Sequence, residues 1–248
     1  MSTEDVSDIL VVCGQGTYRD GAYYTEYADR DVYLGHAMNI GRVASEYRYD
    51  YLVCSGSYTQ AATPGLSEAS SFRSIWADTG THPRLENDHI FFDEYALDSA
   101  ENLYLALMVA RQTLGPRIPM RRIGVYAAWK FKKSRFTQLA RELGIVERFY
   151  FHAFADAGAA EHPDLATKGE AAQMQKMDET RDYLLLSEEW ARKRRQRYRN
   201  PDFEGRLRGL RAGFPRFFAV LDEIAAQGMN EGRRDRLREA FGQVIAGR

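Results

Sequence analysis

Short apolar runs that alternate with amphipathic segments are the feature of this sequence that most constrains its fold. The runs "DILVVC" (8–13), "YDYLVC" (49–54), "HIFFD" (89–93) and "RIGVYAA" (122–128) have the length of strands, and "ERFYFHAF" (147–154) is a candidate fifth. The segments 33–47, 67–80, 99–115 and 133–143 have helical spacing. Strands separated by helices predict a mostly parallel sheet of about five strands that is covered on both faces. We therefore expect an α/β fold, a Rossmann-like three-layer sandwich.

The alternation of strands and helices stops near residue 167. Residues 168–198 have the pattern of one long or broken helix, "RNPDF" (199–203) predicts a break, and helices are expected over 203–226 and 230–246. We therefore divide the chain into a Rossmann-like core (1–167) and a helical C-terminal extension (168–248) that packs on the core.

Composition excludes several classes of protein. The chain of 248 residues has a formal net charge of −1, so no overall field attracts nucleic acid or a membrane surface. The start "MSTEDVSDIL" lacks a basic region typical of a signal peptide, and no apolar run approaches the roughly 20 residues that span a bilayer. We expect a cytoplasmic protein with no membrane anchor.

Ligands of parallel α/β sheets bind beyond the carboxyl ends of the strands, so the loops there are the candidate binding elements. The first loop, "CGQGTYRDG" (13–21), offers Gly14, Gln15, Gly16 and Thr17, and it lacks the third glycine of the dinucleotide fingerprint because Arg19 stands there.

The second loop begins "CSGSYT" (54–59) and offers Ser55, Gly56 and Ser57. We expect Gly14, Gly16, Ser55 and Gly56 to supply backbone N–H donors to an anion. Without a ligand, the same glycines would serve simply as turns.

Acidic residues stand near the starts of two predicted helices. Glu68 has two possible roles. Its negative charge suits the positive end of the helix dipole, or it accepts hydrogen bonds from a ligand and acts as a general base. Asp98 and Glu101 fit a capping box, and Asn102 is placed to reach past the helix start. Glu68, Asp93, Glu94 and Glu101 together offer oxygen ligands for a divalent cation. Helix caps and ion pairs are the favoured roles of these acids, so we predict no metal site.

The stretch "AAWKFKKSRF" (127–136) places four cations at a predicted helix start, where the helix dipole favours anions. Lys132 and Arg135 are three residues apart and share a face if the helix has begun by residue 132. We expect both to bind a phosphate or carboxylate and to stabilise developing negative charge, and we expect Lys130 and Lys133 to lie in solvent. The catalytic candidates are thus Glu68 and Glu101, as bases or orienting groups, with Lys132 and Arg135.

The two cysteines and the five histidines give weaker indications of a catalytic or metal site. Cys13 and Cys54 end neighbouring predicted strands; nearby cations would lower a thiol pKa, yet small buried cysteines there are typically structural. The five histidines show no spacing typical of a zinc site.

Several of these segments, taken in order, resemble the DUF218 (YdcF-like, ElyC/SanA/YdcF) family. They are "ILVVCGQGT", "YLVCSGSYT", "SEA" (67–69), "EYALDSAEN" (94–102) and "YAAWKFKKSRF", and the resemblance covers roughly residues 8 to 202. Lys132 stands where many members have histidine, and Arg135 matches the family's arginine. The "FK-x-x-RF" form is similar to a fungal subgroup. The resemblance implies a Rossmann-like domain and, for one branch, binding of S-adenosylmethionine; it implies no established reaction.

Three functions follow as hypotheses. The first is an enzyme, a transferase or hydrolase, that acts on a small phosphorylated or nucleotide-like anion. The second is a non-catalytic binding protein for S-adenosylmethionine, with Glu68 or Glu101 on the ribose hydroxyls. The third is an interaction protein that uses the basic run "RKRRQRYR" (192–199).

Overall fold

The centre of the molecule is a five-stranded parallel sheet. The computed structural model describes residues 6–25, 30–116, 118–154 and 201–247, with the backbone alone for 201–204. The strands are β1 (Ser7–Cys13), β4 (Tyr51–Ser55), β5 (Ile90–Asp93), β6 (Met120–Ala127) and β7 (Phe149–Ala153), in the order β5-β4-β1-β6-β7. All four neighbouring pairs are parallel. The predicted α/β class and five-stranded sheet are confirmed.

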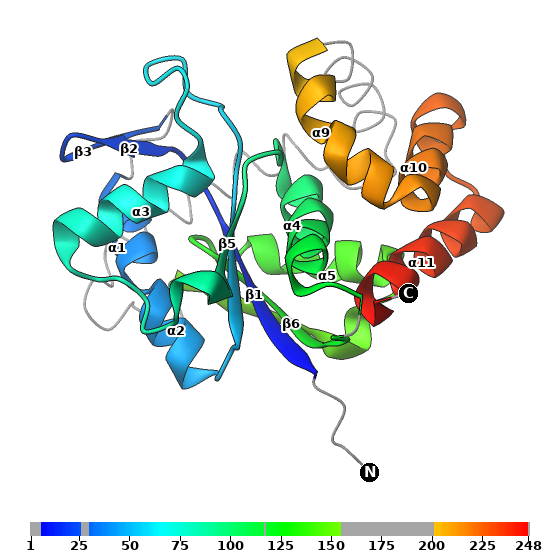
Figure 1. The fold of residues 1–248 in the computed structure, drawn as a ribbon, viewed down its shortest axis with the longest axis horizontal. Helices are drawn as coiled ribbons and strands as arrows, with labels where there is room; N and C mark the ends of the chain where they lie inside the picture. Colours follow the sequence, from blue (N-terminus) through cyan, green and yellow to red (C-terminus); the bar gives the residue numbers. More distant parts are fainter. Residues whose placement is uncertain (1–5, 26–29, 117, 155–200, 248) are drawn as a thin grey trace.

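Helices cover both faces of the sheet (Figure 1). The helices α1 (Arg30–Met38), α2 (Ile40–Glu46) and α3 (Glu68–Thr79) lie on one face, and α4 (Ser99–Leu114) and α5 (Lys132–Glu142) lie on the other. The alternation of β1 decides which residues meet which helices: Ile9 and Val11 join the core under α4, whereas Leu10 and Val12 join the core under α1 and α3.

The helix expected over 33–47 is two helices, α1 and α2, with a break at Asn39. The Asn39 side-chain amide donates to the Gly35 carbonyl at 2.9 Å. Such a local side-chain bond competes with the helical pattern, which helps to explain the interruption.

A small hairpin follows β1 where the sequence led us to expect only a glycine loop. Its strands, β2 (Thr17–Arg19) and β3 (Ala22–Tyr24), pair antiparallel. Asp20 and Gly21 connect them, both with positive φ (53° and 77°). This is the Asp-Gly signal of a tight hairpin turn, and it was present in the sequence.

Three helices lie within the described residues 201–247: α9 (Pro201–Gly213), α10 (Pro215–Gln227) and α11 (Glu231–Ala246). The single helix expected over 203–226 is broken at Phe214, because Pro215 restricts the preceding residue and starts a new helix. Phe217 and Phe241 share one hydrophobic core with Leu103 and Leu107 of α4. The helix expected over 168–198 lies outside the described residues.

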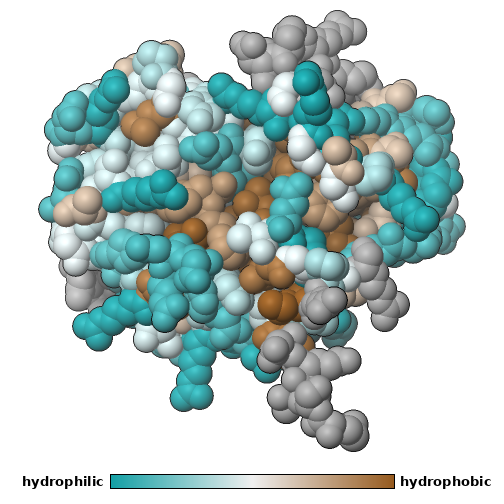
Figure 2. Space-filling model, in the orientation of Figure 1, coloured by the Kyte–Doolittle hydropathy of each residue, from teal (hydrophilic) through white to brown (hydrophobic). Residues whose placement is uncertain are grey.

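Partly buried apolar side chains extend this core toward the surface. Figure 2 shows apolar side chains gathered in the middle of the face drawn, where β5 and α4 lie. Tyr51, Tyr95, Leu97 and Val109 are among those packed against the larger core. Within the described part of the chain, no helix combines the length and the apolar character needed to cross a membrane.

A buried arginine ties α11 to α4. Arg111, which is 5% exposed, donates from Nε to the Val244 carbonyl at 2.6 Å and from Nη2 to the Ile245 carbonyl at 2.9 Å. Its Nη1 donates to the carbonyls of Gly115 and Ile118, each at 2.7 Å. One guanidinium thus satisfies carbonyls at the ends of two helices, where a positive charge is also favoured by the helix dipole.

We predict that Arg111→Met destabilises the protein by about 3 kcal/mol or more, because several buried carbonyls lose a charged donor. Urea unfolding would measure the difference. Arg216→Met, an exposed change on α10, is the matched control and should stay within about 0.5 kcal/mol of wild type. Equal stabilities for the two variants would show that Arg111 does not hold α11 in place.

Candidate functional site

The carboxyl ends of β1, β4, β5 and β6 bring the predicted site residues to one edge of the sheet. The register places Cys13 beside Ser55, and Ser55 beside Asp93. The chain then leaves each strand in step with its neighbour: the Gly14 N–H donates to the Ser55 carbonyl at 2.7 Å, and the Gly56 N–H donates to the Asp93 carbonyl at 2.9 Å.

Glu68 lies between the two glycine loops. A Cβ atom added at Gly14 would lie 2.6 Å from the Glu68 Cβ and 2.7 Å from its Oε2, and one added at Gly56 would lie 2.7 Å from both atoms. Real Cβ contacts are not this short, so neither position has room for a side chain while Glu68 stays in place. The glycines therefore allow the carboxyl group to sit against the backbone of both loops.

Backbone hydrogen bonds fix the start of α3 to the second loop. Ser67 caps the helix, the Glu68 N–H donates to the Ser57 carbonyl at 3.1 Å, and the Ala69 N–H donates to the Gly56 carbonyl at 3.0 Å. The Ser57 N–H donates to the Ala96 carbonyl at 2.9 Å. The backbone donors expected from Gly14 and Gly56 are thus paired with protein carbonyls, and these glycines serve the site by making room for Glu68.

The Glu68 carboxyl titrates near neutrality. Burial raises its pKa to about 7, while a hydrogen bond from the Thr59 hydroxyl and the charge of Lys132 act in the opposite direction. A group with such a pKa takes up and releases a proton at neutral pH, as a general acid or base must. Burial also raises the pKa of the Tyr23 hydroxyl, and the nearby charge of Glu68 raises it further.

Lys132 is the first residue of α5, and it is close enough to Glu68 for their charges to affect one another. Burial lowers the pKa of its ammonium to about 8, the charge of Arg135 lowers it further, and the charge of Glu68 acts to raise it. The helix was expected to start at 133 and starts one residue earlier, so Lys132 and Arg135 do share one face. A bound anion would favour the charged form of an ammonium whose pKa is lowered by burial, so Lys132 is a candidate anion ligand.

Arg135 and Glu101 both contact the segment around the start of α4. The Arg135 Nη1 donates to the Ser99 hydroxyl at 3.3 Å. Asp98 caps α4 as expected, accepting from the N–H groups of Ala100 and Glu101 at 2.9 Å. The Glu101 carboxylate, 1% exposed, accepts from the Leu97 N–H at 2.8 Å, which gives Glu101 a structural role beside the site.

A buried polar network lies beneath the loops. The Ser55 Oγ lies 2.6 Å from the Asp93 Oδ2 and 2.9 Å from the Asn102 Oδ1. Burial raises the pKa of the Asp93 carboxyl to about 7, although bonds from Ser55 and from the backbone of Tyr95 and Ala96 act to lower it. Ser55 and Asn102 therefore anchor β4, β5 and α4 to one another below the site.

The remaining candidates of the first loop face the hairpin. The Gln15 carbonyl accepts from the Thr25 hydroxyl at 3.1 Å, and the Thr17 and Thr63 hydroxyl oxygens lie 2.5 Å apart. At Gly16, an added Cβ would collide with the Tyr24 carbonyl and the Tyr23 ring. In the structure these three residues stabilise the hairpin and the loop above it.

The two cysteines are structural, as expected, and Trp129 also packs in the core. Both thiols are buried, and burial raises the pKa of Cys13 to about 12 and that of Cys54 still further, so both stay protonated at neutral pH. Trp129, 2% exposed, packs edge-on against Tyr33 and donates to its hydroxyl at 3.2 Å.

The acids considered for a divalent cation have other partners. Glu94 accepts from the hydroxyls of Ser67 at 2.6 Å and Tyr58 at 3.1 Å. Among the described residues, the His and carboxylate group that could hold a metal is Glu86, Asp88 and His89, just before β5 and at the other end of that strand from Asp93. Exposed acidic groups of this kind are common without an ion.

Thr59 belongs to the site although the sequence did not single it out, and Asp93, which was considered only as a metal ligand, belongs to the buried network below it. A usable signal existed for Asp93, because an aspartate that ends an otherwise apolar strand ("IFFD") lies at the ligand-binding edge. Thr59 carried no such signal, since its contact with Glu68 depends on the path of the loop.

Comparison with known proteins adds no relative to this description. No family model, no curated protein and no solved structure matches the chain significantly.

We predict that Lys132→Met raises the pKa of Glu68 above about 7, because the carboxylate loses a neighbouring positive charge that favours its ionised form. NMR titration of the ¹³C-labelled glutamate carboxyls would follow it, with Glu68→Gln identifying the signal. Lys133→Met, an exposed change one residue away, should leave this pKa unaltered. A Glu68 signal that titrates near 4.5, the usual value, would contradict the burial described above.

Gly14→Ala should destabilise the protein by about 1–3 kcal/mol, because the added methyl group displaces Glu68 or the loop. Gly242→Ala is the matched control: it lies on α11 with open space around it, and alanine there should stabilise the helix by up to about 1 kcal/mol. Thermal unfolding of both variants tests the pair. A harmless Gly14→Ala would mean that Glu68 does not occupy the space between the loops.

Proposed function

We propose that this protein is an enzyme that binds a small anionic ligand, phosphorylated or nucleotide-like, at the carboxyl edge of its sheet. The observation that carries the proposal is the juxtaposition of the Glu68 carboxyl, wedged between Gly14 and Gly56, with the Lys132 ammonium at the start of α5. A carboxyl that titrates near neutrality and a partly desolvated cation are the two groups that proton transfer to or from an anionic substrate requires.

The roles divide by chemistry. Lys132 and Arg135 neutralise the negative charge of the ligand, and Glu68 exchanges a proton with a ligand hydroxyl or with water. Thr59 orients the Glu68 carboxyl. Asp93, Ser55 and Asn102 support the floor of the site and are positioning residues.

The resemblance to the DUF218 (YdcF-like) family is part of this proposal. In it, Lys132 takes the place of the family's histidine and cannot repeat the chemistry of an imidazole. The proton-transfer group is therefore assigned to Glu68 on the opposite loop, and Lys132 to charge stabilisation.

A thermal-shift screen over inorganic phosphate, sugar phosphates, nucleotides and S-adenosylmethionine would identify the ligand class, because a ligand that binds the folded state raises the unfolding temperature. We expect phosphorylated compounds to stabilise the wild-type protein. Stabilisation by S-adenosylmethionine alone, insensitive to added phosphate, would replace the proposal with the non-catalytic binding function.

Lys132→Met and Arg135→Ala should each weaken binding of the best phosphorylated compound by about 2 kcal/mol or more. Lys133→Met is the control, because this lysine has the same charge and is exposed. Calorimetry at constant ionic strength measures the affinities. If all three variants bind as tightly as wild type, the anion does not bind at this edge.

A further inference from the structure

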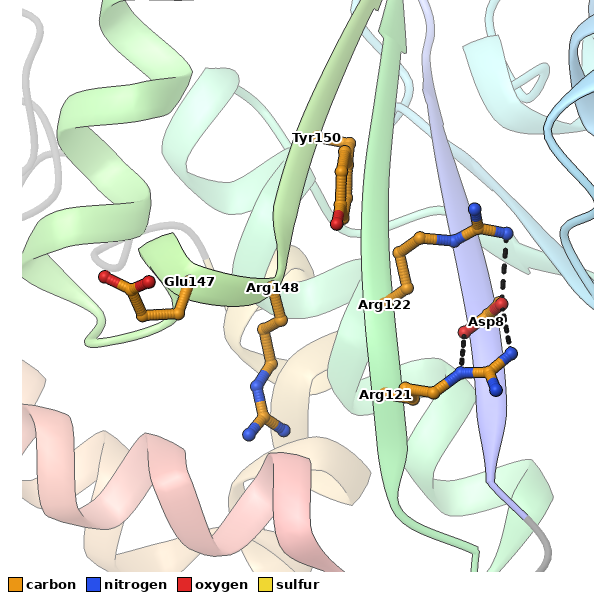
Figure 3. Close-up of a pocket in the computed structure, with 6 residues that line it drawn as sticks. All are labelled: Asp8, Arg121, Arg122, Glu147, Arg148 and Tyr150. Atoms are coloured by element: carbon orange, nitrogen blue, oxygen red, sulfur yellow. Dashed lines mark hydrogen bonds and ion pairs between the residues drawn. The ribbon is translucent and has the colours of Figure 1, made fainter.

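A polar cavity lies at the end of the sheet opposite the carboxyl edge, where the parallel strands begin (Figure 3). Its volume is about 250 Å³, and its lining residues are Asp8, Arg121, Arg122, Glu147, Arg148 and Tyr150. They come from the starts of β1, β6 and β7 and from the short 3₁₀ helix η2 (Val146–Arg148). Three guanidinium groups therefore meet at one cavity in a chain whose net charge is close to zero.

One buried carboxylate serves two of these arginines. Asp8, 3% exposed, accepts from the Arg121 Nε at 2.9 Å and Nη2 at 2.6 Å, and its Oδ2 lies 3.0 Å from the Arg122 Nη2. Both oxygens of Asp8 are engaged by this fork, while the Arg121 side chain remains 62% exposed. The pair of arginines thus carries more positive charge than Asp8 neutralises.

Arg148 adds a third cation on the other side of the cavity. Its Nη1 donates to the Met120 carbonyl at 2.9 Å, which holds the side chain without neutralising it. Among the described residues, no carboxylate lies within ion-pair distance of Arg148. The cavity is lined by three guanidinium groups and the carboxylates of Asp8 and Glu147, and the Asp50 carboxylate, which accepts from the Asp8 N–H at 2.8 Å, also acts on Arg121.

The cavity wall is held in place before any ligand arrives. Arg122 donates to the carbonyls of Tyr47 and Arg48, and its guanidinium lies 4.6 Å from the centre of the Tyr49 ring. Tyr150 is 49% exposed and turns its ring toward the same guanidinium, 6.0 Å away. Groups fixed in this way lose little conformational freedom when they bind a ligand.

We propose that this cavity is an oxyanion-binding site, separate from the carboxyl-edge site, that takes the phosphoryl or carboxylate group of a small molecule. Arg148 and Arg121 supply the charge through the guanidinium N–H groups that Met120 and Asp8 leave unused, and the Tyr150 hydroxyl is an additional donor. Planar guanidinium forks match both oxyanions. Asp8 keeps Arg121 and Arg122 in place, and the Met120 carbonyl holds Arg148.

Binding of inorganic phosphate to the Lys132→Met variant tests the proposal, because that background weakens the other anion site. NMR of the arginine Nε–H groups should show phosphate-dependent shifts of Arg148 and Arg121, and acetate in a parallel titration distinguishes a carboxylate ligand from a phosphoryl one. Arg148→Gln should lower the phosphate affinity at least tenfold. Arg216→Gln, an exposed control, should not change it.

Arg148→Gln is preferred to Arg121→Gln because Arg148 has no acid partner among the residues that the structure describes, so the change leaves none of them unpaired. Arg148→Lys should retain part of the affinity if charge is what binds. Unchanged arginine signals with both anions, or equal affinities in Arg148→Gln and the control, would overturn the proposal. Neither result would bear on Lys132 and Arg135, so the proposals for this site and for the carboxyl-edge site are tested independently.

Discussion

The parallel pairing of β1 with both of its neighbours is the constraint on which the rest of the structure depends. All seven residues of β1 are buried, and the strand is hydrogen-bonded to β4 on one side and β6 on the other. If the register slipped by one residue, Ile9 and Leu10 would each point to the opposite face of the sheet and leave the core in which they now pack. The same register sets Cys13, Ser55 and Asp93 side by side, so the chain leaves the sheet at one edge in three adjacent loops.

That constraint creates the electrostatic conflict at the candidate site. The loops and helix starts at the carboxyl edge take Glu68, Asp93 and Lys132 partly out of water. Burial favours the neutral form of each group, so it raises the pKa of the two carboxyls and lowers that of the ammonium. For Glu68 the folded-state pKa lies above the usual 4.5, so the folded protein loses stability from this group as pH rises toward about 7. A bound anion beside Lys132 would favour the charged ammonium and the protonated Glu68.

The fold was predictable because local and long-range signals agree. The apolar runs and helical spacing located all five strands of the central sheet and the capped helices α3 and α4, since a buried parallel strand and an amphipathic helix each leave a periodic pattern. Breaks caused by single residues were missed: the Asp20–Gly21 turn of the hairpin, Asn39 between α1 and α2, and Pro215 before α10. Each signal was visible in the sequence, but a longer pattern around it dominated the interpretation.

The site was predictable only in part. Strand ends located Glu68, Asn102, Lys132 and Arg135, because topology alone brings them to one edge. The role of Gly14 and Gly56 could not be predicted, because space for the Glu68 side chain depends on the approach of two loops that are distant in sequence. The arginine cavity was missed for a similar reason: Asp8, Arg121 and Arg148 lie near the starts of β1 and β6 and at the end of η2, and they come together only once the strand order is known.

The central claim is that the carboxyl edge holds an anion beside Lys132, and anomalous X-ray scattering from crystals soaked in selenate tests it most directly. The account predicts a selenium peak within hydrogen-bond reach of the Lys132 ammonium, on the side that faces Glu68. Well-ordered crystals with no peak at that edge, while selenate occupies other sites, would contradict it.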